Sequence, residues 1–398
     1  MSPHTAWRPD DTQQLLLEAC LLDDLARARE SLDAWSRRAD VGRLDSGSYR
    51  LLPLLWKRLP YLGSEFPSRD LLKGVYRRTW YANRLSIGRL SRLVSVIRAA
   101  DVPAMVVKGV PLSLEAYRDA GVRPMGDGDL VVPRVSARRA VETLVAAGWR
   151  PGVTPLTGAM VEGSPATARW TVGPRPLEAF DESYFGVRHA HGFATDDGFD
   201  VDLHWALFQG CCDRGADDAA WARAHPLDLG GEWALAPSPA DHLLLLLAHG
   251  ARWNPIPPIR WVADVVSLLR TSTPSWPIFL ADARRRGLVV PARDMLTWLE
   301  PRFSVGVPRE VLEALRSEPV EAADEHAWAR RSAPPGVASG LDELAYLRDR
   351  HRTLRSDPLA GVVPPFPAFV RHVLGAESLL QVGLYGAGEI ARRLGARG

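Results

Sequence analysis

The chain has 398 residues, of which 46% are hydrophobic and 24% are charged, and its formal net charge is +2. This length and composition are typical of a globular protein with enough apolar side chains for a sizeable core, and they exclude a disordered chain. The nearly balanced charge excludes a strongly polybasic or polyacidic mode of binding. We therefore expect no long nucleic acid as a partner.

Cysteine content and hydropathy indicate the compartment. The three cysteines, Cys20, Cys211 and Cys212, are too few for a disulfide framework and fit a reducing environment. Residues 1–14 lack a basic segment followed by an apolar run, so the sequence predicts no signal peptide. The most apolar stretch, residues 243–248, is too short to cross a bilayer. We expect a cytoplasmic protein without a membrane partner.

Changes in sequence pattern divide the chain into three regions. Residues 1–98 carry apolar side chains at helical spacing. Residues 99–236 contain short β-branched runs separated by turns and short helical patterns. Residues 237–398 return to helical spacing, interrupted by proline clusters. The sequence therefore predicts an α+β fold in which a small mixed sheet is flanked by helical regions at both ends.

The first expected elements are two amphipathic helices, over residues 12–35 and 77–100. Pro53, Pro60 and Pro67 are expected to break the chain between them, because proline lacks the backbone N–H that a helix interior requires. The N-terminal region should therefore consist of helices joined by proline-containing turns.

The expected sheet begins with a short buried strand over residues 102–107. The strand ends at Lys108-Gly109, where we expect a tight turn followed by a helix over residues 110–119. A second strand should cover residues 129–132. The arrangement is therefore a strand, a tight turn, a helix and a second strand.

A later strand is predicted over residues 199–205. Alternation along it places Val201 and Leu203 on one face and Asp202 and His204 on the other. The apolar face should join the core, so the polar face is available for chemistry.

Three aspartates carry the candidate chemistry. Asp127 and Asp129 are two residues apart, so in an extended segment their carboxylates project to the same side, about 7 Å apart along the strand. Asp202 lies between apolar neighbours, where a carboxylate is costly unless it meets a cation or hydrogen-bond donors. Carboxylate oxygens suit Mg²⁺, and three such groups converging would form a two-metal site for nucleotidyl transfer. We predict that these aspartates are catalytic and hold Mg²⁺, with Mn²⁺ as the alternative ion.

The strand–turn–helix unit that precedes them is suited to phosphate. Gly109 lets the backbone approach an anion, and the start of the helix offers free N–H donors. Lys108 adds a positive charge, and Ser113 is the nearest hydroxyl. Arg123, four residues before Asp127, is placed to bind a phosphate through two hydrogen bonds. We predict that these residues bind the phosphates of a substrate.

These segments resemble a known family. Residues 105–132, 201–207 and 249–269 are similar to the uncharacterised nucleotidyltransferase-like family of the DNA polymerase β nucleotidyltransferase superfamily. The shared pattern is a strand ending in Lys-Gly, an Arg before an Asp-x-Asp pair, a Val-Asp-Leu-His-Trp strand and an Arg-Trp-x-x-Asp helix. The positions that match it are Lys108, Gly109, Arg123, Asp127, Asp129, Asp202, His204, Arg260, Trp261 and Asp264.

The resemblance implies a small mixed-sheet nucleotidyltransferase core over residues 99–236. It implies a Mg²⁺-dependent enzyme that moves a nucleotidyl or related phosphate-linked group from an NTP-type donor to a small-molecule or (phospho)peptide acceptor. Some relatives accompany peptide natural-product pathways, so natural-product tailoring is one setting. Arg260 is a candidate for substrate binding, or Asp264, four residues later, anchors it on the helix.

Two departures from the wider superfamily leave a second hypothesis open. The usual phosphate loop there is Gly-Ser or Gly-Gly, whereas this chain has Lys108-Gly109. The residue between the paired aspartates is usually apolar, whereas here it is Gly128, which weakens a strand. The alternative is a catalytically inactive nucleotide- or partner-binding module of the same fold.

The histidines of the sheet region allow two further interpretations. His204 shares the face of Asp202, where it is either a hydrogen-bonding partner of that carboxylate or of the substrate, or a buried structural histidine. A zinc hydrolase is the third hypothesis, in which His189 and His191 join Asp202 and His204 as ligands. No HExxH motif accompanies these residues, so we rank this hypothesis last.

Overall fold

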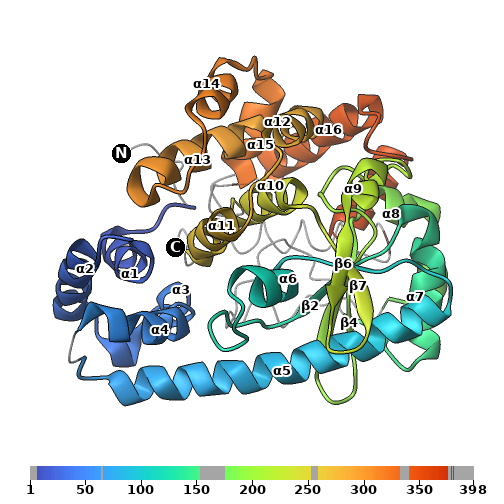
Figure 1. The fold of residues 1–398 in the computed structure, drawn as a ribbon. Helices are drawn as coiled ribbons and strands as arrows, with labels where there is room; N and C mark the ends of the chain where they lie inside the picture. The colour runs from blue at the N-terminus through green and yellow to red at the C-terminus, as the bar shows by residue number, and fades with distance from the viewer. Residues whose placement is uncertain are drawn as a thin grey trace, which may run out of the picture.

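The computed structural model describes most of the chain. The described residues are 7–63, 66–152, 175–251, 259–331, 340–374, 378 and 380. Of the expected strand-and-turn region, residues 153–174 lie outside this description, as do residues 381–398 of the expected C-terminal helical region. The prediction of a mixed sheet flanked by helical regions is confirmed (Figure 1).

The N-terminal region is helical where it is described. Its elements are α1 (Asp11–Leu21), α2 (Leu25–Arg38), η1 (Val41–Arg43), α3 (Ser46–Tyr49), α4 (Leu52–Leu62) and α5 (Arg69–Ala99). The expected helix over residues 12–35 is two helices, because the Asp24 side chain accepts hydrogen bonds from the N–H groups of Ala26 and Arg27 and starts α2. The prediction that Pro60 breaks the chain is wrong. It lies inside α4, which continues past it to Leu62 at the loss of one backbone hydrogen bond.

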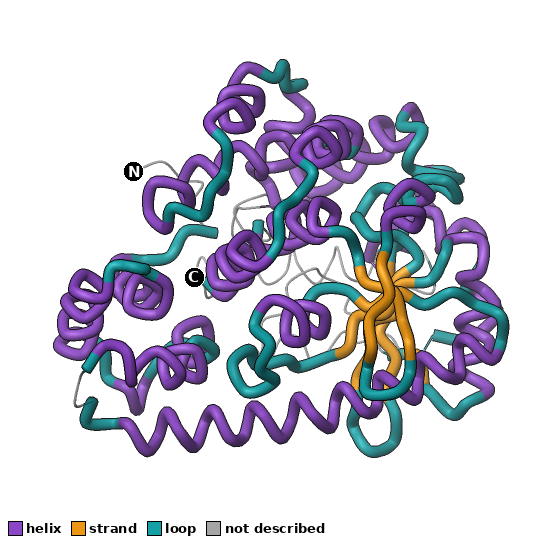
Figure 2. Tube along the Cα trace, viewed as in Figure 1, coloured by secondary structure: helices purple, strands orange, loops and turns teal. Residues whose placement is uncertain are grey.

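Within the described residues, seven strands form one sheet (Figure 2). They are β1 (Met105–Val106), β2 (Gly128–Val131), β3 (Arg150–Pro151), β4 (Ala190–Ala194), β5 (Asp200–His204), β6 (His225–Asp228) and β7 (Trp233–Ala236). Their order is β3-β4-β5-β2-β1-β7-β6. The sheet is mixed because β2 runs parallel to β5 and β1 parallel to β7, whereas the other neighbours are antiparallel.

Short helical elements connect the strands. They are α6 (Gly109–Pro111), η2 (Leu112–Ala116), η3 (Arg134–Ser136), α7 (Ala137–Ala146), η5 (Leu177–Ala179), α8 (Glu182–Val187) and α9 (Asp218–Arg223). The predicted helix over residues 110–119 is thus shorter than expected, and η2 is a π-helix. Such π-helical turns occur often at functional sites.

The C-terminal region is again helical. Its elements are α10 (Pro239–Gly250), α11 (Arg260–Thr271), α12 (Trp276–Arg285), α13 (Val289–Phe303), α14 (Arg309–Ser317), α15 (Ala322–Arg331), α16 (Gly340–Ser356) and α17 (Phe366–Leu374). Ser238 begins α10, since its side chain accepts a hydrogen bond from the Asp241 N–H. Among the described helices, none is long and apolar enough to cross a membrane.

Both faces of the sheet are covered. Leu130 and Leu203 pack with Leu90 of α5 and Leu144 of α7 in a core on one face. Val131 instead belongs to a second core, which includes residues of α10 and α11 and of helices α1, α2 and α4. The terminal helical regions therefore share one core, and the predicted divisions at residues 98 and 236 stay predictions.

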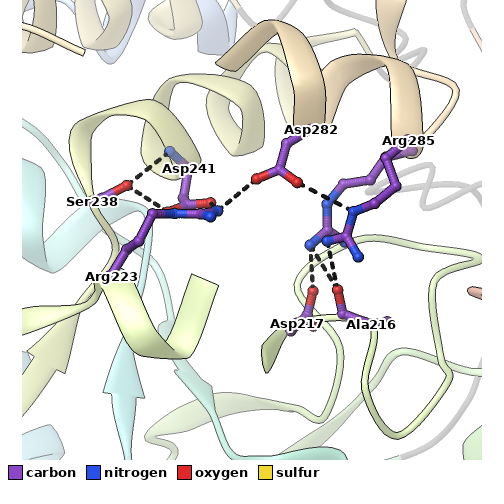
Figure 3. A network of polar contacts seen from close by, with 8 residues as sticks. Ala216, Asp217, Arg223, Ser238, Asp241, Asp282 and Arg285 are labelled. Carbon is purple, nitrogen blue, oxygen red and sulfur yellow. Dashed lines mark hydrogen bonds and ion pairs between the residues drawn. The ribbon is translucent and has the colours of Figure 1, made fainter. Parts of the chain in front are cut away.

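A chain of ion pairs fixes the helices beside the sheet (Figure 3). Arg223 of α9 lies 2.6 Å from Asp241 of α10 and 2.5 Å from Asp282 of α12. Arg285, at the end of α12, lies 3.3 Å from Asp282 and donates a hydrogen bond to the Ala216 carbonyl. These contacts join three helices to the loop that follows β5, which holds the C-terminal helices against the sheet.

Candidate metal and phosphate site

Two of the predicted aspartates meet through the register of parallel strands. Asp129 of β2 lies opposite Asp202 of β5, and Val131 lies opposite His204. Because side chains alternate along a strand, Asp129, Asp202 and His204 project from the same face. One ligand atom of each of these three residues lies within 4.8 Å of the others. Residues distant in the sequence therefore form one compact cluster.

Two glycines shape the surroundings of this cluster. A Cβ atom added at Gly192 of β4 would lie 3.3 Å from Asp202 Oδ1, so this glycine leaves room beside the carboxylate. A Cβ atom at Gly128 would lie 3.3 Å from a Leu90 methyl group of α5. The glycine between the two aspartates therefore points away from the cluster and lets the long helix pack closely against β2.

Asp129 is buried between two cationic or potentially cationic groups. The Lys108 ammonium forms an ion pair with Asp129 Oδ1, and His204 Nε2 lies 3.2 Å from the same oxygen. Burial alone would raise the pKa of Asp129, but Lys108 and His204 together hold it well below its usual range. Asp129 is therefore a carboxylate, the form in which it can bind a cation.

The backbone of Lys108 is unusual. Its φ angle is 56° and its ψ angle is −108°, a combination that side-chain-bearing residues rarely adopt. This conformation follows directly on β1 and precedes α6, and it accompanies an ammonium group aimed at Asp129. The Lys108 carbonyl in turn faces the imidazole of buried His242 on α10. A strained residue held on both sides is typical of a functional loop.

The predicted phosphate ligand Arg123 lies in a buried ion pair. Its Nε and Nη2 atoms each lie 2.8 Å from a different oxygen of Asp264, and the Tyr117 hydroxyl donates to the same carboxylate at 3.0 Å. Asp264 therefore anchors Arg123 rather than Arg260. A Cβ atom at Gly109 would lie 2.6 Å from Arg123 Nη1, so the glycine gives the guanidinium room beside the Lys108-Gly109 turn.

The segment that leads into β2 is clamped by residues from two helices. Asn83 of α5 donates to the carbonyls of Ala120 and Arg123 at 2.6 and 2.7 Å and accepts from the Met125 N–H at 3.2 Å. Arg260 of α11 donates to the Pro124 carbonyl at 2.6 Å. Sequence reasoning missed Asn83, although a polar residue at a position of the apolar stripe of α5 was a usable signal.

Comparison with known proteins identifies the family of this chain. Residues 48–303 match the family described as "Uncharacterised nucleotidyltransferase". The chain belongs to this nucleotidyltransferase family. A solved structure similar to this chain is the antigenic nucleotidyltransferase-like protein from Paracoccidioides brasiliensis, with 15% identity and a TM-score of 0.33 over 60% of this chain and 96% of that one. We found no match among curated proteins.

The remaining predicted site residues of this family member lie around the cluster. Asp127 precedes β2, is exposed, and is not among the three clustered residues. Partial desolvation of its carboxyl group and the negative charges of Asp129 and Asp202 raise the pKa of Asp127 above its usual range. Ser113 is buried in η2, and its hydroxyl has no hydrogen-bond partner among the described residues.

The four-residue zinc set does not converge. His191 of β4 lies on the opposite face of the sheet from Asp202, where its Nδ1 is 2.7 Å from the Tyr184 hydroxyl and its ring contacts Phe180. Burial lowers the pKa of His191 to about 3, so the residue is neutral. The prediction that His191 and Asp202 are zinc ligands together is therefore wrong. Successive side chains of β4 point to opposite faces, and it is Gly192, not His191, that shares the face of Asp202.

Proposed function

We propose that this protein is a metal-dependent nucleotidyltransferase that acts on an NTP-type donor. One observation carries the proposal: Asp129, Asp202 and His204 have ligand atoms within 4.8 Å of one another, in a chain of a nucleotidyltransferase family. The Lys108 ammonium lies beside this cluster and supplies the positive charge that a triphosphate requires.

The donor set fits a divalent cation. Two carboxylates and an imidazole converge from two adjacent strands, and the missing Cβ of Gly192 leaves space beside Asp202. Asp129 and Asp202 would hold the ion as Mg²⁺ or Mn²⁺, with Asp127 as a third carboxylate at the exposed side. A bound ion would supply charge stabilisation for the phosphates and the attacking oxygen. His204 would either join the ligands or orient the Asp129 carboxylate through a hydrogen bond.

The other residues would bind and orient the donor. Lys108 would neutralise phosphate charge, and the space at Gly109 would let the donor approach the backbone. Arg123 is fixed by Asp264 through Nε and Nη2, so its contribution to phosphate binding would come from Nη1 at the Gly109 turn. We include Ser113 as a further ligand candidate. The acceptor oxygen would bond to the α-phosphorus as the bond to the pyrophosphate leaving group breaks.

The acceptor is proposed from the family resemblance. We expect a small molecule or a (phospho)peptide, with natural-product tailoring as one setting. Arg260 holds the Pro124 carbonyl through Nη1, and we propose that its guanidinium also approaches the acceptor or donor from α11. These assignments extend the proposal from the metal cluster to the helices that cover it.

The test is release of pyrophosphate from a panel of NTPs with Mg²⁺ or Mn²⁺ and candidate acceptors. Asp129→Asn and Asp202→Asn should each abolish release, whereas Asp200→Asn, an exposed change on the same strand and face as Asp202, should leave it within about twofold. Equal activity in all variants would refute the site. Nucleotide binding without turnover or metal dependence would instead favour the inactive binding module.

A further inference from the structure

Helix α5 concentrates positive charge that the rest of the chain balances. Its 31 residues include eight basic side chains and one acidic side chain, whereas the whole chain has a formal net charge of +2. The acidic residue, Asp70, lies in the first turn, so residues 71–99 contain no negative charge. A helix with this imbalance is either neutralised by its neighbours or exposes its charge to a partner.

In the structure, most of these basic side chains lie on the solvent-exposed outer face of the helix. The inner face buries Thr79, Asn83 and Leu90 against the rest of the protein. At the edges, Arg89 lies 2.5 Å from Asp197 and Arg98 lies 2.5 Å from Glu232. The exposed cations on the outer face, for which the described part of the chain provides no ion pair, are Lys73, Arg77, Arg78, Arg84 and Arg92. Figure 1 shows that α5 forms one edge of the molecule, with no labelled element on its outer side.

Large apolar side chains lie among these cations. Trp80 is 47% exposed, Tyr81 is 62% exposed and Leu85 is 47% exposed. All three fall within two turns of the helix, between Lys73 and Arg92 along its length. We call the set formed by these apolar residues and the five cations the outer patch of α5. It extends from Lys73 to Arg92, about 28 Å at the rise of an α-helix.

We propose that the outer patch of α5 is a docking surface for an acidic peptide segment with apolar anchors. Exposed aromatic side chains interspersed with arginines are typical of the composition of a protein–protein interface. Trp, Tyr and Arg are the residues that most often dominate binding at such interfaces. Acidic side chains of the partner would pair with Arg77 and Arg84 while its apolar side chains cover Trp80 and Tyr81.

The neighbouring charges add a second argument. Lys73 and Arg77 are four residues apart, so their like charges repel on the isolated helix. A carboxylate bound between them would remove this repulsion, and arginine accepts carboxylates through two parallel hydrogen bonds. A single-stranded nucleic acid would use the cations and the aromatic rings but leave the aliphatic Leu85 without a role. The composition of the patch therefore favours a peptide.

The test measures binding of fluorescein-labelled synthetic peptides to the full chain by fluorescence anisotropy. The probe is an amphipathic helix of Glu and Leu, and its control has the same composition in scrambled order. Arg77→Glu with Arg84→Glu should weaken binding at least about tenfold, and Trp80→Ala with Tyr81→Ala about fivefold. The matched control, Arg27→Glu with Arg37→Glu on exposed positions of α2, should change affinity less than about twofold.

Three outcomes would overturn the proposal. The first is equal binding of the probe to all variants, and the second is equal binding of the ordered and scrambled peptides. The third is α5-dependent binding of a poly-uridine oligonucleotide or of phosphatidylserine vesicles that is tighter than that of the peptide. The substituted side chains are exposed, so loss of folding is not expected, and circular dichroism of each variant verifies this. The result is independent of nucleotidyl transfer, because the assay measures binding alone.

Discussion

The ion pair between Arg123 and Asp264 makes a quantitative prediction about stability. Arg123 is 6% exposed and Asp264 is 3% exposed, and two hydrogen bonds of 2.8 Å join them. Replacing Arg123 by Met leaves a buried carboxylate that keeps only the nearby charge of Arg260 and the hydrogen bond from the Tyr117 hydroxyl. Losing one member of a buried pair costs roughly 3–5 kcal/mol, because the other charge stays desolvated. We expect this decrease in the free energy of unfolding.

The double variant Arg123→Met with Asp264→Leu separates charge burial from packing. Removing both charged groups eliminates the unpaired charge, so most of the lost stability should return. Urea unfolding of the wild type, both single variants and the double variant measures the coupling energy. A loss below about 1 kcal/mol in Arg123→Met, or a double variant whose loss is the sum of the two single losses, would refute the reasoning.

The same double variant tests the proposed role of Arg123 in phosphate binding. Since its fold should be retained, any change in nucleotide affinity reports on the loss of the Arg123–Asp264 pair rather than on unfolding. We expect triphosphate binding to weaken about tenfold, the effect of losing one charge-assisted hydrogen bond. Unchanged affinity in isothermal titration calorimetry would restrict Arg123 to holding the turn at Gly109.

Three further predictions concern the neighbourhood of the site. Asn83→Ala should lower the free energy of unfolding by about 1–3 kcal/mol and weaken Mn²⁺ binding, because Asn83 makes three hydrogen bonds to residues 120–125; Asn83→Asp, which cannot donate to these carbonyls, should not rescue it. His204→Ala should weaken Mn²⁺ binding about 10–100-fold, measured by electron paramagnetic resonance, whereas an unchanged affinity would make His204 structural. Burial lowers the pKa of His242 to about 4, so the unfolded chain takes up a proton first as pH falls, and about 3 kcal/mol of stability should be lost between about pH 6.5 and 4. His242→Phe should flatten this slope in urea unfolding at several pH values, and an unchanged slope would contradict it.

Local patterns were sufficient for much of the site. The alternation over residues 199–205 placed Asp202 and His204 on one face, and the structure has them there. The Lys108-Gly109 turn was visible as the end of a β-branched run. These signals depend on neighbours within a few residues, so they can be read without the tertiary structure.

The missing parts depend on contacts between distant segments. Nothing in the pattern around Arg123 shows that Asp264, on a helix of the C-terminal region, is its partner, and the spacing on the helix favoured Arg260 instead. The place of His204 beside Asp129 follows from the register of β5 against β2, which the sequence does not specify. Likewise, composition alone groups the histidines as zinc ligands. The register of β4 against β5 directs His191 to the opposite face of the sheet from Asp202.

Helix α5 contacts the candidate site with its inner face and solvent with its outer face, and the two faces can be tested separately. On the inner face, Asn83 holds the segment before β2 and Leu90 packs against Gly128 of β2, so changes there should alter the cluster of Asp129, Asp202 and His204. On the outer face, Arg77 and Tyr81 make none of these contacts. Since side chains on opposite faces of one helix do not touch each other, outer-face variants should change partner binding while nucleotide affinity stays constant. An outer-face variant that changed both would show that the partner and the donor are coupled through α5 itself.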